Sequence, residues 1–420
     1  MSRRVQIQSI YSFQEAISQG TSLPVPYGEY CVNGMYKRLF FNRQLASIYA
    51  LSTLYAFAYD IVSLLIPFHL LDKGYSLQEM GALIAFSNII MPAVPIITGY
   101  ISDRVSRGKL FVAILTMHFP TLVTLVFSWN VAGIVASLTA FNIVSSMYTT
   151  VIVPLLADYA PKENVSKILG LHSFFISLGG VAAYMSGGYI ASKWGCATAI
   201  LIAAPFFLVA GLPALPLMKY EAFKKRLKGE VTIRRKYVFS FWFLYFFMSG
   251  LATFTLSSLL QVYIKMRYQV SIMEIGFIYT LGRLLFFLKP VIGYVGDRIR
   301  QLTTVILLQI IAASLCIFIP FVSLTEFIAI LLVLYLVGMC YDIIFKALLI
   351  RIVPRKMLGT IYGGRGAAFE LAMMIAPALA GFMLEYNPAL MFLLVSLLTI
   401  AQIPILIIAS KTFTKETKIR

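Results

Sequence analysis

The sequence predicts an all-α integral membrane protein with twelve transmembrane helices, and three observations support this prediction. Of the 420 residues, 60% are hydrophobic and only 12% are charged, and the mean hydropathy is +0.86. Soluble domains are usually about 45–50% apolar and about 25% charged. The apolar residues also lie in runs of roughly 20 or more, the length that a helix needs to cross a bilayer. This composition excludes a soluble enzyme, a nucleic-acid-binding protein and a disordered chain.

Twelve such runs can be placed from hydropathy and from residues that break helices. Helices are expected because lipid offers the backbone no hydrogen-bond partners, whereas the strands of an outer-membrane barrel are shorter and alternate in polarity. The first six spans are 44–71, 79–100, 109–128, 132–157, 167–191 and 195–218. The last six are 237–264, 274–296, 303–322, 325–350, 357–383 and 388–410.

The Lys and Arg residues predict the orientation. Of the 35, four lie in loops on one side, namely Lys73, Lys193, Lys265 and Arg267, and four lie inside spans, namely Arg283, Lys289, Lys346 and Arg365. The remaining 27 share the side of the amino terminus. Cytoplasmic segments carry such an excess, so we expect both termini in the cytoplasm and the protein in the cell membrane. The net charge of +18 then reflects this bias and attraction to anionic lipid on the cytoplasmic face.

The largest polar break, between the sixth and seventh spans, predicts the domain organisation. It contains Lys224, Lys225, Arg226, Lys228, Arg234 and Arg235. We expect a basic cytoplasmic arm (1–43), a six-helix bundle (44–218), a basic cytoplasmic linker (219–236), a second six-helix bundle (237–410) and a cytoplasmic tail (411–420).

A repeated motif relates the two halves. Gly99-Tyr-Ile-Ser-Asp103-Arg104 follows the second span, and Gly293-Tyr-Val-Gly-Asp297-Arg298 follows the eighth, 194 residues later. The glycine is expected to let two helices approach closely. The aspartate at the membrane edge can face the positive amino-terminal end of a neighbouring helix, and the arginine anchors the cytoplasmic end.

These residues resemble the major facilitator superfamily. The cytoplasmic loop motif after its second helix is matched by Gly99, Asp103, Arg104 and Arg107, and the acidic end of its fourth helix by Asp158. The resemblance implies a cytoplasmic latch at these residues and at their repeat, Gly293, Asp297 and Arg298. It also implies two six-helix bundles that work by alternating access. Helices one, four, seven and ten would line the path between them, and helices three, six, nine and twelve would face lipid.

Seven ionisable residues lie well inside the spans: Asp60, Arg283, Lys289, Asp342, Lys346, Arg365 and Glu370. Each would cost roughly 2.5–3.5 kcal/mol at the centre of a helix in lipid. They are therefore expected to face one another, water or a solute. None lies on a span that the resemblance places against lipid.

Depth along the spans separates these residues into groups. We expect Arg283 and Glu370 near the substrate level, with Tyr279 one turn from Arg283 on the same helix face. Asp342 and Lys346 lie lower and one turn apart, so they can pair, either at the substrate path or as a structural ion pair. Lys289 and Arg365 are expected nearer the cytoplasm.

The predicted function is secondary transport of a small polar organic solute, for example an organic acid, coupled to protons through Asp60 or Glu370. Aromatic residues on the expected lining helices, such as Tyr148 and Phe246, keep open a multidrug efflux proton antiporter. A receptor or scaffold without transport is a weaker alternative, because it has no need of deep charges. The sequence contains no nucleophile–base pair, phosphate loop or metal cluster, so we expect neither an enzyme nor a cofactor or metal, and we expect a monomer.

Overall fold

The computed structural model describes residues 43–102, 104–159, 165–219, 236–289, 291–292, 299–353 and 355–417. The chain divides into two compact units, Met1–Ala46 and Ser47–Arg420. Almost all of the predicted arm and of the predicted linker lies outside the described residues. We call the part of the second unit before residue 220 the first half, and the part from residue 236 the second half.

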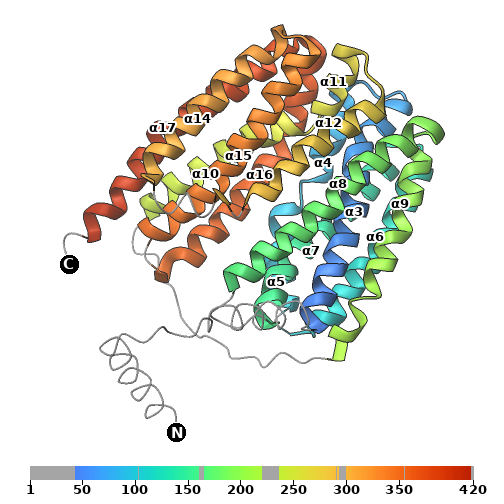
Figure 1. Ribbon diagram of the computed structural model, residues 1–420, viewed down its shortest axis with the longest axis horizontal. Helices are drawn as coiled ribbons and strands as arrows, with labels where there is room; N and C mark the ends of the chain where they lie inside the picture. The colour runs from blue at the N-terminus through green and yellow to red at the C-terminus, as the bar shows by residue number, and fades with distance from the viewer. Residues whose placement is uncertain are drawn as a thin grey trace, which may run out of the picture. The chain divides into compact units, whose positions relative to one another are not determined.

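The regular elements of the described residues are all helices. Those of the first half are α3 (Arg43–Asp72), α4 (Leu77–Ser87), η1 (Met91–Ala93), α5 (Val94–Ser102), α6 (Arg107–Phe127), α7 (Val131–Tyr159), α8 (Val165–Trp194), α9 (Cys196–Gly211) and η3 (Leu215–Lys219). Those of the second half are α10 (Lys236–Ser257), α11 (Leu260–Tyr268), α12 (Ile272–Leu284), η4 (Leu285–Leu288), α14 (Gln301–Phe318), η5 (Ile319–Phe321), α15 (Leu324–Ile352), α16 (Arg355–Tyr386) and α17 (Pro388–Thr417). Figure 1 shows the second half, coloured yellow to red, beside the first.

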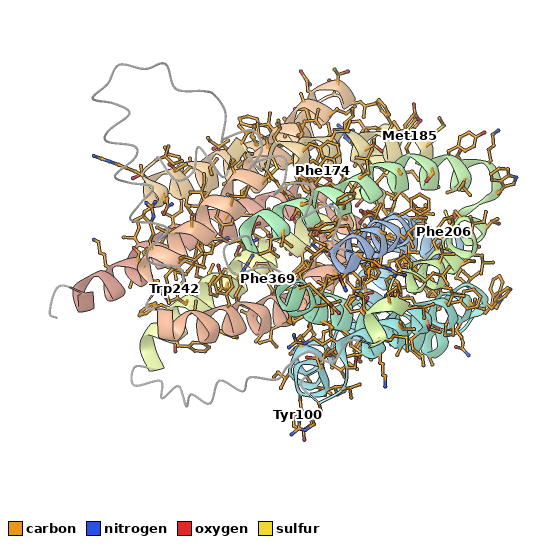
Figure 2. The ribbon with its side chains drawn as sticks, turned by 60° about the horizontal axis from the view of Figure 1, so that its bottom comes forward. Tyr100, Phe174, Met185, Phe206, Trp242 and Phe369 are labelled. Atoms are coloured by element: carbon orange, nitrogen blue, oxygen red, sulfur yellow. The ribbon has the colours of Figure 1, made fainter. Side chains whose placement is uncertain are left out.

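Within the described residues, ten helical stretches are long and apolar enough to cross a membrane. At the other two predicted spans the structure has shorter helices, α9 with 16 residues and α12 with 13. Large apolar side chains cover much of the outer surface. Tyr100 and Met185, which are 61% and 56% exposed, project from the ribbon in Figure 2. Apolar side chains exposed in this way suit contact with lipid, so the chain is a multi-pass membrane protein.

α4 and α12 begin with the same local structure, a capping box that Ser323 and Glu326 also form before α15. Before α4, the Ser76 hydroxyl accepts a hydrogen bond from the Glu79 amide, and the Glu79 carboxylate accepts one from the Ser76 amide. Ser271 and Glu274 form the same capping box before α12, 195 residues later. Such reciprocal caps satisfy amide groups that the first turn of a helix leaves unpaired. The internal repeat therefore extends to the starts of α4 and α12.

In α4 and in α12, the capping box is followed by a glycine at which the two halves meet. A methyl group on Gly81 of α4 would lie 2.3 Å from the Pro377 carbonyl oxygen and 3.0 Å from Cα of Gly381 on α16. A methyl group on Gly276 of α12 would lie 2.3 Å from the Tyr184 carbonyl oxygen on α8. Backbone therefore packs on backbone, as in membrane helix pairs with small residues at the crossing. We call α4–α16 and α12–α8 the two glycine crossings.

Both glycine crossings lie near one end of the helices, which we call the short-loop end. It carries the turns 73–76, 128–130, 269–271 and residue 387. Lys73 Nζ donates to the carbonyl oxygen of Val126 at 3.1 Å, which holds the first two of these turns together. The Glu385 carboxylate accepts a hydrogen bond from the Gln78 amide at 2.7 Å, which joins the end of α16 to the start of α4. The halves are thus joined at the short-loop end by backbone packing and by a carboxylate at a helix amino terminus.

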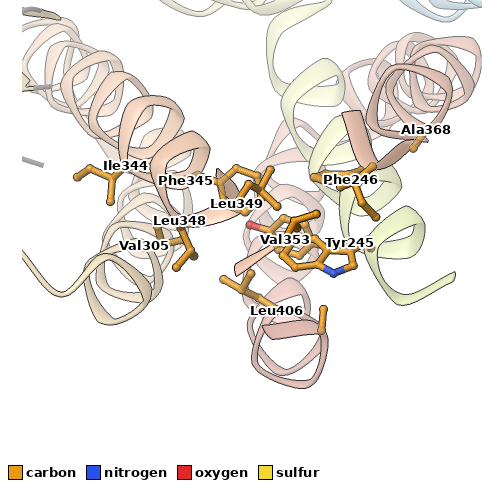
Figure 3. Close-up of a cluster of buried hydrophobic side chains, with 13 residues drawn as sticks. Tyr245, Phe246, Val305, Ile344, Phe345, Leu348, Leu349, Val353, Ala368 and Leu406 are labelled. Atoms are coloured by element: carbon orange, nitrogen blue, oxygen red, sulfur yellow. The ribbon is translucent and has the colours of Figure 1, made fainter. Parts of the chain in front are cut away.

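The second half has an aromatic core of its own (Figure 3). Tyr245 of α10 stacks on Phe345 of α15, with 5.3 Å between ring centroids. Leu349 and Leu406 are fully buried in the same cluster and bring in α15 and α17. Because lipid chains are as apolar as these side chains, close packing rather than exclusion of water stabilises the cluster.

We predict that Gly81→Ala and Gly276→Ala lower the thermal stability of the purified protein. Each methyl group would force apart two backbones in contact, and overpacking of this kind typically costs about 1–3 kcal/mol. Gly170→Ala is the matched control. Gly170 also lies within a helix, α8, but a methyl group there would meet no atom of the described residues within 4 Å. Melting temperatures that fall equally for all three variants would contradict the crossings.

Candidate functional site

A buried ion pair connects the two halves. Arg283 of α12 donates from Nη2 to Oδ2 of Asp60 on α3 at 2.6 Å, across 223 residues of sequence. The side chains are only 20% and 8% exposed. Charges removed from water in this way are tolerated when a partner and hydrogen bonds satisfy them. Neither of the two spans carries another deep residue of the opposite charge. The pair therefore neutralises a carboxylate and a guanidinium that have no such partner on their own helices.

The surroundings of the ion pair are built from a glycine and several tyrosines. A methyl group on Gly180 of α8 would lie 2.4 Å from both Asp60 Oδ2 and Arg283 Nε, so only glycine leaves room for the pair. Tyr184, one turn further along α8, is a second partner of the Asp60 carboxylate. Its ring lies 5.4 Å from that of Tyr279, whose hydroxyl donates to Gln261 Oε1 at 3.3 Å. Polar groups thus line an otherwise apolar contact between α3, α8 and α12.

Arg283 keeps one donor unused. Its Nε is buried and has no hydrogen-bond acceptor among the described residues. The guanidinium is also near the Phe286 ring, with 5.3 Å from Cζ to the ring centroid. An unpaired buried donor costs free energy unless an acceptor reaches it. The guanidinium therefore keeps one unsatisfied donor, which is covered in this conformation.

Glu370 is placed apart from the pair. It lies half-buried on α16, and no basic group of the described residues is within ion-pair distance of it. It is close enough to Tyr59 of α3 to act on its hydroxyl electrostatically. Arg283 and Glu370, predicted to share one level, therefore do not pair with each other in this structure.

A second charge cluster lies entirely in the second half. Lys346 Nζ is 2.6 Å from Oδ2 of Asp342, and Arg365 Nη2 is 3.6 Å from Oδ1 of the same carboxylate. Asp342 and Lys346 are 39% and 45% exposed, so this cluster is much less buried than the Asp60–Arg283 pair. Lys289 follows η4, with Nζ 4.4 Å from the centroid of the Phe286 ring. One carboxylate thus serves two cations, and a third cation lies nearby.

Most residues of the predicted latch lie outside the described residues. Asp103, Gly293, Asp297 and Arg298 lie outside the described residues, and so does the side chain of Asp158. Arg104 is exposed and stacks on the Tyr100 ring at 3.2 Å. Arg107 donates to the Pro154 carbonyl oxygen at 3.2 Å, which ties the start of α6 to the end of α7.

Gly99 makes no close helix approach in this conformation. A methyl group there would meet no atom of the described residues within 4 Å, so the role of Gly99 in the latch stays a prediction. The face of α5 that carries Gly99 is not packed against another described segment at that point. Close approaches are instead made by Gly81, Gly180 and Gly276.

Two aromatic residues expected along the path are buried within their own halves. Tyr148 stacks on Tyr55 with ring centroids 3.4 Å apart, and its hydroxyl donates to Ser52. Phe246 belongs to the core cluster of the second half. Sequence reasoning also missed Gly180 and Tyr184, although a glycine-rich stretch around them was visible in the sequence.

We predict that Arg283→Gln destabilises the protein by about 3–5 kcal/mol, because it leaves a buried carboxylate without its partner. The double variant Asp60→Asn/Arg283→Gln should recover much of this loss. Lys346→Gln is the matched control in an exposed pair and should cost less than about 1 kcal/mol. Unfolding of these three variants, of the single variant Asp60→Asn and of the unsubstituted protein in the same detergent measures the coupling. Equal losses for the Arg283 and Lys346 variants, or no recovery in the double variant, would contradict a buried pair.

Sequence comparison relates the chain to membrane transporters. Residues 48–349 match the family model described as Major Facilitator Superfamily. An uncharacterized MFS-type transporter of Methanocaldococcus jannaschii is 26% identical over 167 residues, which are 40% of this chain and 39% of that protein.

Solved structures share the fold at low sequence identity. A bacterial homologue of the iron transporter ferroportin, in an inward-facing state, has a TM-score of 0.67 and 14% identity, over 88% of this chain and 99% of that chain. An inward-facing, occupied bacterial homologue of the human lysosomal transporter Spinster has a TM-score of 0.64 and 14% identity, over 89% and 96% of the two chains. The human organic anion transporter TETRAN has a TM-score of 0.60 and 17% identity, over 87% and 99%. With a family model matched over most of its length and with this all-helical fold, the chain belongs to the major facilitator superfamily of membrane transporters.

Proposed function

We propose that the protein is a secondary active transporter that moves a small organic acid across the cell membrane by alternating access, coupled to protons. The observation that carries the proposal is the buried Asp60–Arg283 pair between the two halves. A guanidinium inside the membrane offers a carboxylate two parallel hydrogen bonds. A carboxylate beside it can exchange a proton with the water that accompanies a solute.

The topology that we propose has twelve spans in two bundles of six, with both termini in the cytoplasm. Ten of the spans are the long apolar helices, and α9 and α12, each with the 3-10 segment that follows it, would be the other two. The short-loop end then carries the loops with few Lys and Arg and faces outside. Residues 1–43, 219–236 and 411–420 are the cytoplasmic arm, linker and tail of this arrangement. The 27 Lys and Arg residues on the cytoplasmic side would also bind anionic lipid.

With this orientation, the conformation is the one closed to the outside. The glycine crossings and the Gln78–Glu385 hydrogen bond join the halves at the outer end. Further inward, Phe174 of α8 still contacts Phe287 of η4, with ring centroids 5.2 Å apart. Two of the structures with this fold are also described as inward-facing. Transport would require both glycine crossings to separate while contacts form at the opposite end.

An anionic solute is favoured by the charges near the site. Arg283 has an unused donor among the described residues, and Asp342 is shared by Lys346 and Arg365. Since Asp60 occupies the guanidinium in this conformation, a solute carboxylate must displace it. One protein of the same fold, TETRAN, is described as an organic anion transporter, which is consistent with this substrate class.

Proton coupling follows from the competition for Arg283. When Asp60 takes up a proton it loses its charge, and its attraction to the guanidinium falls. Arg283 is then free to bind a carboxylate, so the proton and the anion bind together and the site stays neutral. When the proton leaves, Asp60 re-forms the pair and expels the anion. Glu370, without a basic partner among the described residues, is the candidate for a second proton site.

We predict that Asp60→Asn abolishes accumulation driven by a pH gradient, because the pair can no longer alternate between a proton and Arg283. The measurement is uptake of a panel of small organic acids into proteoliposomes, with and without an imposed gradient. Asp72→Asn, which changes an exposed carboxylate at the end of the same helix, is the control and should reduce accumulation less than twofold. Full gradient dependence in Asp60→Asn would remove Asp60 from this role. No uptake of any acid by the unsubstituted protein would favour the alternatives, drug efflux or a receptor without transport.

We also predict that a disulfide at the short-loop end blocks transport reversibly. In a background without Cys31, Cys196, Cys316 and Cys340, the pair Gln78→Cys/Glu385→Cys joins α4 to α16. Oxidation should reduce uptake at least tenfold, and a reductant should restore it, because the outer end could no longer open. Each single Cys variant is the matched control. Undiminished uptake by the crosslinked protein would exclude opening between α4 and α16.

A further inference from the structure

The second half contains a partly open cavity of about 470 Å³. All of its lining residues lie between Ser249 and Gln402, on α10, α11, η4, α14, α15 and α17 and at residue 289. Its walls are mainly apolar, and its volume is in the range of small-molecule binding pockets. The Asp60–Arg283 pair lies outside it. Phe286, whose ring lies beside the Arg283 guanidinium, lines the cavity, so the cavity borders the ion pair although its lining comes from the second half alone.

An interrupted helix borders this cavity. α10 ends at Ser257 and α11 starts at Leu260, and both of these residues line the cavity. The break contains neither proline nor glycine. Non-helical backbone at membrane depth is tolerated only where it is buried in protein or lines a cavity. The break and the cavity are thus consistent with each other, as expected for a site rather than for a packing defect.

The cavity wall contains an unused hydrogen-bond acceptor. Gln309 of α14 is 4% exposed and lines the cavity. Its Nε2 donates to Gln402 Oε1 at 3.2 Å and to the Tyr245 hydroxyl at 3.4 Å. Its Oε1 is buried and has no donor among the described residues. Since both amide hydrogens are engaged, the oxygen is held in place as an unsatisfied acceptor, and a ligand must displace the side chains that cover it to donate a hydrogen bond.

The cavity also contains a cation whose charge is not balanced by a close carboxylate. Lys289 lines it, and no carboxylate of the described residues lies within ion-pair distance of its Nζ. Asp342 lines it too, but Lys346 and Arg365 already share that carboxylate. The remaining charge in the cavity is therefore positive, which favours an anion over a cation.

We propose that this cavity is a second binding site, which takes an amphipathic organic acid. The apolar body of the ligand would fill the space between α10, α14 and α15. Its carboxylate would pair with Lys289, and a hydroxyl or amide hydrogen would reach Gln309 Oε1. The site depends on one half of the protein alone, so it does not rest on the proposed transport cycle.

The test is binding of 6-hydroxy-2-naphthoate to the full-length protein in lipid nanodiscs, measured by equilibrium dialysis against empty nanodiscs. This probe has an apolar ring system, one carboxylate and one hydroxyl donor. Its methyl ester lacks the charge, and 2-naphthoate lacks the donor. We expect the ester to bind at least tenfold more weakly than the probe, and 2-naphthoate several-fold more weakly.

Variants locate the site. Lys289→Gln should remove the preference for the acid over its ester, and Gln309→Leu the preference for the hydroxyl. Ala312→Phe places a ring in the cavity and should reduce binding at least tenfold. Ser314→Phe, an exposed position on the same helix, is its matched control and should bind as the unsubstituted protein does.

The double variant Asp60→Asn/Arg283→Gln removes both charges of the pair between the halves, so it leaves no free guanidinium there and should leave probe binding unchanged. Binding that survives Ala312→Phe, or an acid-to-ester ratio that is the same in Lys289→Gln, would overturn the proposal. The ratio keeps the test decisive if Ala312→Phe does not fold. Loss of probe binding in the double variant Asp60→Asn/Arg283→Gln but not in Lys289→Gln would also overturn it, while the proposed transporter function would stand.

Discussion

The need to neutralise charge inside a membrane constrains the rest of this structure. Asp60 and Arg283 lie on different halves of the chain, and each would be costly to bury alone. Their ion pair forms only if α3 and α12 come together, and α8 can lie against them only because position 180 is a glycine. The same contact that balances the charges therefore sets the distance between the halves.

The contacts that join the halves suit an assembly that comes apart in the proposed transport cycle. The glycine crossings bury backbone against backbone without interlocking side chains, and in lipid such packing gains little from exclusion of water. The ion pair can be exchanged for another ion or dissolved by a proton. The aromatic core of the second half, in contrast, interlocks Tyr245, Phe345 and Leu349 and is suited to move as one unit.

The two charge systems differ in burial and so in what they can do. The Asp60–Arg283 pair is nearly closed to solvent and connects the halves, so a change in its charge acts on their separation. Asp342 and Lys346 are 39% and 45% exposed and, with Arg365, lie within the second half, where screening weakens their attraction. Of the three, Asp342 lines the cavity of that half. The two halves thus share a repeated helical framework but carry different charged residues.

Hydropathy and Lys/Arg distribution alone determined the class of this protein, because lipid imposes length, helicity and charge asymmetry on any chain that crosses it. The sequence also identified the deep charges and the spacing of Asp342 and Lys346, since both are local properties of one helix. Which residue faces Asp60 was decided only by the tertiary structure, because Arg283 lies 223 residues away on another half. The roles of Gly81, Gly180 and Gly276, and the absence of a close contact at Gly99, depend on which helix face meets which neighbour. In a uniformly apolar helix, the sequence has no periodicity that indicates which face meets which neighbour.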